Sequence, residues 1–360
     1  MPVPHPVSTV PLRAVRPRAW AYAARRAGRG FWRHQDHDLA AGLTYHALLA
    51  LFPALVALVS LLGLLGAGDE SADTVLVVAR LLVPAEALAV VEPLVESLAA
   101  SSSRVVTLVA GVVLALGFVT VYVLAVGRAL NRVHEVREGR PLLPRLLRTA
   151  VLTLVLGVLV LVAAVLLLLS APVTAALGSE LGVGSPVVRL LGVLKWPLLA
   201  VVLAVLVGLI YARAPNLRPP HRRWVSPGAV LAIAGWLLGS LAFGFYVSHV
   251  AGYQRTYGAL AGLVVLLVWL WVSHLALLLG AEVDREVERV RQLAAGVPAE
   301  DRVVLELRDV RLSERMAAKD RRDVAEGRRL RPAGRPPAEG LRPDVGPEDA
   351  EARGSSPSSP

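Results

Sequence analysis

The sequence predicts an all-α fold, a polytopic six-helix transmembrane bundle with amphipathic interfacial helices and a disordered C-terminal tail. Of the 360 residues, 55% are hydrophobic, and the mean hydropathy of +0.58 exceeds what a soluble core requires. Residues 257–281 contain no Asp, Glu, Lys or Arg. At about 1.5 Å per helical residue, such a run spans the roughly 30 Å hydrocarbon core of a bilayer. Arginine is concentrated in every second link between the apolar runs, which predicts six spans with both termini in the cytoplasm.

Charge and cysteine content narrow the classes of function. The chain contains no cysteine, which excludes disulfides, thiolate metal sites and cysteine nucleophiles. The net charge is +10, but the 16 Lys and Arg that follow residue 281 are balanced by 17 Asp and Glu. The basic excess therefore lies in residues 1–281, mostly in short segments beside the apolar runs. This distribution indicates topology signals and contacts with anionic lipid head groups, and not a nucleic-acid partner.

A basic amphipathic segment is expected at residues 1–38. Trp20, Ala24, Ala27 and Phe31 fall on one helical face and arginines on the other, so we expect a helix lying on the inner membrane surface. The arginines expected to contact anionic lipid lie in this segment and beside later spans: Arg25, Arg26, Arg29, Arg33, Arg128, Arg132, Arg222 and Arg223.

The six predicted spans cover residues 39–65, 105–126, 146–170, 187–211, 228–249 and 257–281. Small and polar residues recur along several of them at helical spacing, which predicts faces turned toward other helices, because small residues let helix backbones approach in lipid. On the first span this stripe is Gly42, His46, Ala50, Pro53, Ala57, Ser60 and Gly63. On the fifth span it is Gly228, Ala232, Gly235, Gly239, Ala242, Tyr246 and His249. On the sixth span it is Gly258, Gly262, Trp269, Ser273, Ala276 and Gly280.

The segments outside the spans differ in composition. Residues 66–103 are polar and mostly acidic, and we expect one or two amphipathic helices there against the outer surface. Residues 282–312 are expected to form a cytoplasmic helical extension. Residues 313–360, rich in Arg, Pro, Gly and Ser and ending in GSSPSSP, are expected to be a disordered cytoplasmic tail.

The densest ionisable motif is HQDHD, which places His34, Asp36, His37 and Asp38 just before the first span. An interfacial cap for that span, with Asp38 near the helix N-terminus, is favoured over a metal site, because no second His/Asp cluster supplies further ligands. The sequence contains neither a GxxxxGK[ST] loop nor a GxSxG motif, which disfavours an ATP-driven pump and a serine hydrolase. RNA hydrolysis requires clustered metal carboxylates or paired histidines, and the ionisable groups are dispersed along the chain. No catalytic residue, metal or cofactor is predicted.

Three blocks of sequence resemble the YihY/BrkB family of bacterial inner-membrane proteins. They are residues 38–63 (DLAAGLTYHALLALFPALVALVSLLG), 211–249 and 257–282. The residues that match the family's recurring features are Tyr45, Phe52, Pro53, Asn131, Ala214, Pro215, Asn216, Pro227, Gly228, Trp236, Tyr246, Tyr257, Gly258, Trp269, Gly280, Ala281 and Glu282. His46 and His274 depart from the family pattern. Some members have carried the label ribonuclease BN, and others are linked to serum resistance and to export of envelope lipids.

The resemblance implies a multi-pass protein of the bacterial plasma membrane that transports or translocates a lipid or an envelope-related molecule. The alternative is a non-transporting membrane scaffold or envelope assembly factor; both leave the oligomeric state open. The polar residues expected to line a cavity or to function are Tyr45, His46, Pro53, Tyr122, Asn131, Asn216, Tyr246, His249, Trp269, Ser273, His274 and Glu282. His46 and His274 are predicted at the same depth, about 10 Å from the cytoplasmic surface, where they could share a polar pocket. The favoured alternative is that each histidine bonds to a backbone carbonyl or a hydroxyl on its own.

Overall fold

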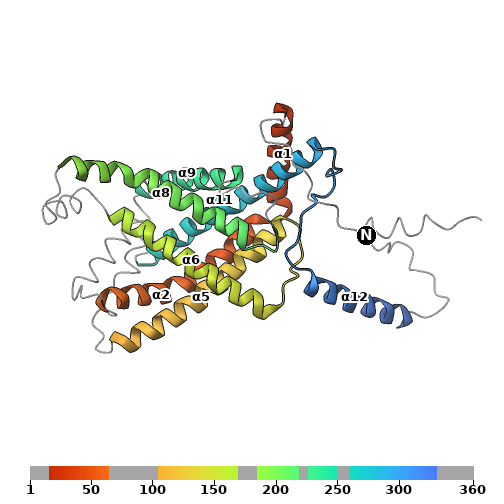
Figure 1. Ribbon diagram of the computed structural model, residues 1–360, viewed down its shortest axis with the longest axis horizontal. Coiled ribbons are helices and arrows are strands. Elements are labelled where there is room, and N and C mark those ends of the chain that lie inside the picture. The colour runs from red at the N-terminus through yellow and green to blue at the C-terminus, as the bar shows by residue number, and fades with distance from the viewer. Residues whose placement is uncertain (1–15, 65–103, 169–184, 219–225, 250–258, 331–360) are drawn as a thin grey trace, which may run out of the picture. The chain divides into compact units, whose positions relative to one another are not determined.

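The computed structural model describes residues 16–64, 104–168, 185–218, 226–249 and 259–330. Within these ranges the regular elements are helices, joined by turns and by one isolated antiparallel bridge between Leu217 and Leu307. In chain order the helices are α1 (Pro17–Arg33), α2 (Asp36–Leu64), α5 (Arg104–Val133), α6 (Leu142–Leu168), α8 (Ser185–Arg213), α9 (Pro227–His249), α11 (Ala259–Ala294) and α12 (Arg311–Leu330) (Figure 1). The predicted all-α architecture is confirmed.

Five of these helices are long and apolar enough to cross a membrane. They contain the segments Val109–Val133, Leu142–Leu167, Gly192–Arg213, Pro227–Val247 and Gly262–Ala294. The first predicted span lies on α2, which is not among the five and whose side chains are described only as far as Ala54. The count of six spans therefore stays a prediction. The amphipathic helices expected in residues 66–103 fall outside the described residues.

The core of the bundle lies where α2, α5 and α11 meet. α2 packs along α5, and α11 packs against α1, α2, α5 and α9, while α6 joins α5 to α8 (Figure 1). Ala40, Leu43, Leu130 and Leu278 form the centre of the contact between the first three helices, and each is at most 3% exposed. α11 is therefore the element against which most of the site is assembled.

The small-residue faces predicted on the fifth and sixth spans pack against each other and form a seam. A Cβ atom added at Gly280 would overlap the carbonyl oxygen of Gly228, the Tyr211 hydroxyl and the Ala232 side chain. The reciprocal change at Gly228 would overlap the carbonyl oxygen of Gly280. These glycines let α9 and α11 cross with their backbones in contact, as close packing in lipid requires. Ala276 continues the seam one turn away, 3.6 Å from a Cβ built at Gly235.

α1 forms as predicted, but its buried face is different. Ala23, Ala27 and Gly30 are buried where α1 packs on α11, whereas Trp20 of the predicted apolar face is 39% exposed. The smallest side chains at steps of four and three residues let α1 approach α11 closely. α1 is thus a packed helix as well as an amphipathic one.

Two boundaries of the C-terminal region are corrected. The expected helical extension over residues 282–312 ends at Ala294, and Gly296, with φ of +80°, follows in a turn. The tail expected to be disordered from residue 313 forms α12 up to Leu330, with no buried residue. Its Ala, Arg, Glu and Lys residues have high helix propensity, which the Arg-rich composition concealed. Residues 1–313 and 314–360 are separate compact units, so α12 is described here by itself.

Candidate functional site

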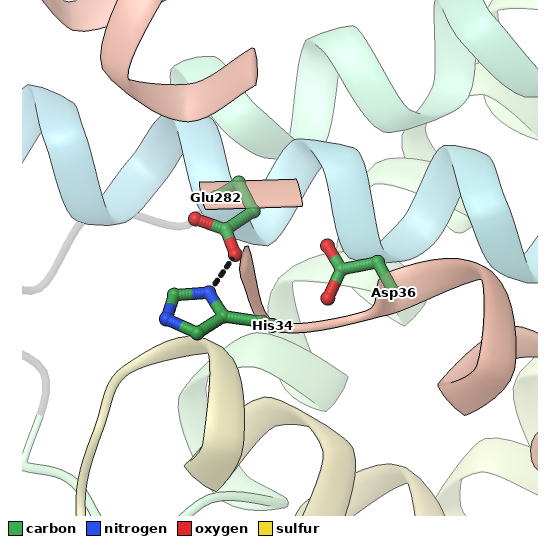
Figure 2. Close-up of side chains that lie close together, drawn as sticks. All are labelled: His34, Asp36 and Glu282. Carbon is green, nitrogen blue, oxygen red and sulfur yellow. Dashed lines mark hydrogen bonds and ion pairs between the residues drawn. The ribbon is translucent and has the colours of Figure 1, made fainter. Parts of the chain in front are cut away.

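The turn between α1 and α2 places two ionisable side chains against α11. α1 ends at Arg33 and is capped by His34, whose backbone N–H donates to the Gly30 carbonyl at 2.8 Å. Gln35 then has φ of 58°, in the left-handed region, and α2 begins at Asp36. Because of this single turn residue, the side chains of His34 and Asp36 both lie close to Glu282 of α11 (Figure 2).

His34, Asp36 and Glu282 form a buried acid–histidine cluster. Their exposed fractions are 6%, 0% and 0%, and one ligating atom from each lies within 4.8 Å of those of the others. Nδ1 of His34 contacts Oε1 of Glu282. Gly30 is required for this approach, because a Cβ there would overlap the Glu282 carboxylate. The premise that the ionisable groups of the chain stay dispersed is therefore wrong at this point.

Glu135, in the turn after α5, balances two arginines beside the cluster. Its carboxylate binds Arg33 at 2.7 Å and Arg285 at 2.6 Å. Nε2 of His34 also lies 3.1 Å from Oε1 of Glu135, so the imidazole is held between two carboxylates.

Glu286, one turn beyond Glu282 on α11, balances two further arginines. It binds Arg26 at 3.1 Å and Arg289 at 2.7 Å, and Arg289 also donates to the carbonyl oxygen of Ala299 at 2.5 Å. These pairs fasten α1 and the segment after α11 to the end of α11. None of these pairs includes Asp36 or Glu282.

Two groups of the cluster lie outside the predicted spans, and both have raised pKa values. The pKa of His34 is raised mainly by its hydrogen bond to Glu282, which outweighs the opposing effect of burial. The pKa of Asp36 is raised to about 7 by burial and then by the negative charge of Glu282. Burial without a partner disfavours the charged carboxylate.

A second polar group, the inner polar triad of Thr44, Tyr122 and His274, lies between α2, α5 and α11. Nδ1 of His274 is 3.2 Å from the Thr44 hydroxyl, and Nε2 is 2.9 Å from the Tyr122 hydroxyl. Since Thr44 donates to the Ala40 carbonyl at 2.9 Å, its oxygen is free to accept from Nδ1–H, and Nε2 accepts from Tyr122. His274 is 4% exposed. Eight residues separate it from Glu282, about 12 Å along the helix.

His46 and His274 do not meet, and the favoured alternative, in which each has its own partners, is the one found. Nδ1 of His46 bonds instead to the Gly42 carbonyl of its own helix, at 2.8 Å, and His274 has Thr44 and Tyr122 as partners. Thr44 and His46 are two residues apart, about 200° around the helix, so only one of them faces α11. Correspondingly, Gly42 of the predicted inward stripe is exposed, although Ala50 is buried.

Asn131 and Asn216 form a structural anchor. They are the two asparagines of the chain, they are separated by 85 residues, and the backbone N–H of Asn216 donates to Oδ1 of Asn131 at 2.8 Å. The amide of Asn216 donates to the carbonyls of Arg137 at 3.2 Å and Asp309 at 2.8 Å. They join the links that follow α5, α8 and α11.

Trp269 and Ser273 bridge α9 and α11. The indole N–H of Trp269 donates to Ser240 at 3.2 Å, and that of Trp236 donates to Ser273 at 3.1 Å. These reciprocal bonds give both residues a packing role on the predicted seam. Pro53 lies within α2 and is partly exposed.

Three predicted polar residues do not join the interior. Tyr45 is 60% exposed and Tyr246 57% exposed, and His249 is exposed near the end of α9. The faces of α2 and α9 that carry these residues point away from the other helices, and His249 is in addition the last residue of α9.

The predicted lipid-contacting arginines divide into two groups. Arg26 and Arg33 are in ion pairs, and Arg132 donates to Gln35 at 2.9 Å. The other three of these arginines that the structure describes, Arg25, Arg29 and Arg128, are exposed. Arg222 and Arg223 lie outside the described residues.

Sequence reasoning missed Glu135, Arg285, Glu286 and Arg289 as parts of the site. The available signal was the opposite charges at steps of three and four residues after Glu282, which mark a paired helix face. It gave no indication that this face would be covered by α1.

Comparison with known proteins gives a consistent family. The sequence pattern of the family described as Virulence factor BrkB matches residues 27–303. A Bacillus subtilis protein, YfkH, whose name calls it ribonuclease-like, is 30% identical over 72% of this chain and 93% of its own length. UPF0761 membrane proteins of Alkalilimnicola ehrlichii and Nitrosospira multiformis are 32% and 29% identical over 68% and 70% of the chain. The matches span 53% and 57% of those two proteins. No solved structure matches the chain.

Proposed function

We propose that this chain, which belongs to the BrkB family of membrane proteins, translocates a lipid or an envelope-related molecule across the bacterial plasma membrane, with both its termini in the cytoplasm. The observation that carries the proposal is the inner polar triad, in which α2, α5 and α11 each contribute one polar side chain to the interior of an apolar bundle. Polar residues inside membrane helices are costly and typically mark a substrate or ion pathway.

The triad is suited to a pathway because its hydrogen bonds are exchangeable. Each unsatisfied polar group in hydrocarbon costs several kcal/mol. If the only role of these positions were to pack the helices together, Leu and Ala would do so without that cost. The hydrogen bonds among Thr44, Tyr122 and His274 can be exchanged for bonds to a substrate that supplies hydroxyl or phosphate oxygens. The acid–histidine cluster lies about 12 Å away along α11, at the end of the bundle. Together, the triad and the cluster place polar side chains at two levels along α11.

The basic surface supports an anionic substrate or lipid environment. Arg25 and Arg29 of α1 and Arg128 of α5 are exposed, and each basic residue near a membrane surface adds roughly 1 kcal/mol of attraction to anionic lipid. Trp32, 70% exposed, lies on the same helix as Arg25 and Arg29, and tryptophan favours the interface between water and lipid.

A non-transporting scaffold is the second candidate. It is favoured by α12, a helix of 20 residues with no buried side chain, which offers a surface for a partner. An RNA-cleaving enzyme is disfavoured because His34, Asp36 and Glu282 are at most 6% exposed, so a phosphodiester backbone cannot reach their ligating atoms.

The proposal is tested by cysteine accessibility in nanodiscs, since the chain has no native cysteine. Single cysteines replace Leu43, Ala47 and Leu278, near the triad, and Leu154 serves as an outward-facing control that is 57% exposed. A pathway predicts water-soluble labelling of the triad positions that changes when anionic phospholipid is added. Labelling that is absent there under every condition would contradict the proposal and favour the scaffold.

A further inference from the structure

We propose that His34, Asp36 and Glu282 bind one divalent transition-metal ion, of the Mn²⁺ or Zn²⁺ type, at the junction of α1, α2 and α11. The site goes beyond the proposed function and does not depend on it, because a metal ion here would fasten the α1–α2 turn to the end of α11 whether or not a substrate moves through the bundle.

The donor set matches this class of ion. One imidazole nitrogen and two carboxylate oxygens lie within 4.8 Å of one another, and mixed nitrogen and oxygen donors suit Zn²⁺ and Mn²⁺ better than an all-oxygen ion such as Mg²⁺. Three protein ligands leave positions for water, as in metal sites that are not purely structural.

Unpartnered oxygens provide the independent evidence for a missing ligand. Asp36 is 0% exposed, yet neither of its carboxylate oxygens has a hydrogen-bond partner within the described structure. Oε2 of Glu282, also 0% exposed, is likewise unpartnered. Figure 2 shows the Asp36 carboxylate directed into the space beside Glu282 and His34. Buried polar atoms are rarely left without a partner, and a cation supplies one for all three oxygens.

The local charges show why the neighbouring arginines do not fill this role. Arg285 binds Glu135 through Nη2. Its Nε and Nη1 are buried without a hydrogen-bond partner in the described structure, and they bond to neither Asp36 nor Glu282. Arg132 donates to Gln35. When Asp36 is ionised, Asp36 and Glu282 together bring two buried negative charges, which His34 alone cannot neutralise. A divalent cation removes this imbalance, whereas leaving a buried carboxylate uncompensated costs several kcal/mol.

Glu135 supplies the outer support expected of a metal-binding histidine. Its Oε1 lies 3.1 Å from Nε2 of His34. With Nε2–H donated to Glu135, Nδ1 would offer its lone pair to the ion in place of its present hydrogen bond to Glu282. Metal-ligating histidines characteristically donate their second ring N–H to a carboxylate in this way. Gly30 completes the site, because a side chain there would displace the Glu282 carboxylate.

The test measures metal content and affinity of the full chain, purified in nanodiscs without a histidine tag. The protein is stripped with EDTA, exposed to Mn²⁺ or Zn²⁺ with Mg²⁺ as a comparison, desalted, and analysed by mass spectrometry of the metal. We expect about one Mn²⁺ or Zn²⁺ per chain in the wild type and at least a tenfold loss of affinity in Asp36→Asn and in Glu282→Gln, since even outer-shell changes cost 10–100-fold.

Matched variants keep the result interpretable. Asp38→Asn, whose side chain is 68% exposed in the same segment, should retain the wild-type content. If either ligand variant misfolds, Gly30→Ala provides the second test, because it should weaken binding without removing a ligand. No bound metal in the stripped and reloaded wild type would overturn the site, as would equal affinity in wild type, Asp36→Asn and Glu282→Gln, the result expected of an adventitious ion only.

Discussion

Replacing Asn216 by Ala should destabilise the bundle without touching the candidate site. The side chain is fully buried and donates to the carbonyls of Arg137 and Asp309. Each lost hydrogen bond costs about 1 kcal/mol, and the cavity adds to this, so we expect a loss of about 2–4 kcal/mol. At about 2.1 cal/mol/K per residue, a chain of 360 residues shifts by about 1.3 °C per kcal/mol, so that loss lowers the unfolding temperature by about 3–5 °C.

The assay is thermal unfolding in nanodiscs followed by tryptophan fluorescence. Arg218→Ala is the matched control, because it lies two residues away and removes an exposed ion pair with Glu306 whose side chains are 60% and 56% exposed. Such a pair contributes at most about 1 kcal/mol. An unfolding temperature for Asn216→Ala within about 1 °C of the wild type, or equal to that of Arg218→Ala, would refute the anchor role.

Three further predictions concern the seam, a largely buried ion pair and the topology. Gly280→Ala should lower the unfolding temperature markedly because its Cβ overlaps the neighbouring backbone, whereas Gly244→Ala, which meets nothing within 4 Å, should not; equal effects would contradict the seam. Burial raises the pKa of Glu138, whereas its hydrogen bonds and ion pair with Arg140 lower it. The lowering effects together are larger, so the pKa lies below its usual value. The pair therefore stabilises the fold above about pH 4.5 and is lost as pH falls through the lowered pKa; the advantage of wild type over Glu138→Gln should shrink below that pH, and an advantage independent of pH would exclude the pair. Reporter fusions after residues 70 and 290 should report opposite sides of the membrane, and a common side would contradict six spans.

The sequence was sufficient to predict features that depend on local spacing. The seam of Gly228, Gly235 and Gly280 follows from steps of three, four and seven residues on single helices, and the apolar length of each run sets where a helix can span. Helix ends were less predictable. α5 continues to Val133 and α11 to Ala294, because arginine and glutamate continue a helix as readily as leucine does.

Features that depend on rotation and on distant contacts could not be predicted in this way. Thr44 and His46 are equally polar candidates, and only the packing of α2 on α11 decides which of them meets His274. Likewise, the HQDHD motif contains two members of the acid–histidine cluster, His34 and Asp36. The third member, Glu282, lies beside them because of the left-handed turn at Gln35, and the spacing of residues along a helix does not predict such a turn. His274 is buried inside the bundle, although its partners are Thr44 and Tyr122 and not His46.

The most direct test of the proposed function is translocation of a fluorescent anionic phospholipid in proteoliposomes, with protein-free vesicles and His274→Phe as comparisons. The phenyl ring fills the space of the imidazole but bonds to neither Thr44 nor Tyr122. We predict that the wild type moves the lipid between leaflets at least tenfold faster than protein-free vesicles and that His274→Phe loses most of this rate. A wild-type rate equal to that of protein-free vesicles, or one unchanged in His274→Phe, would contradict translocation through the inner polar triad.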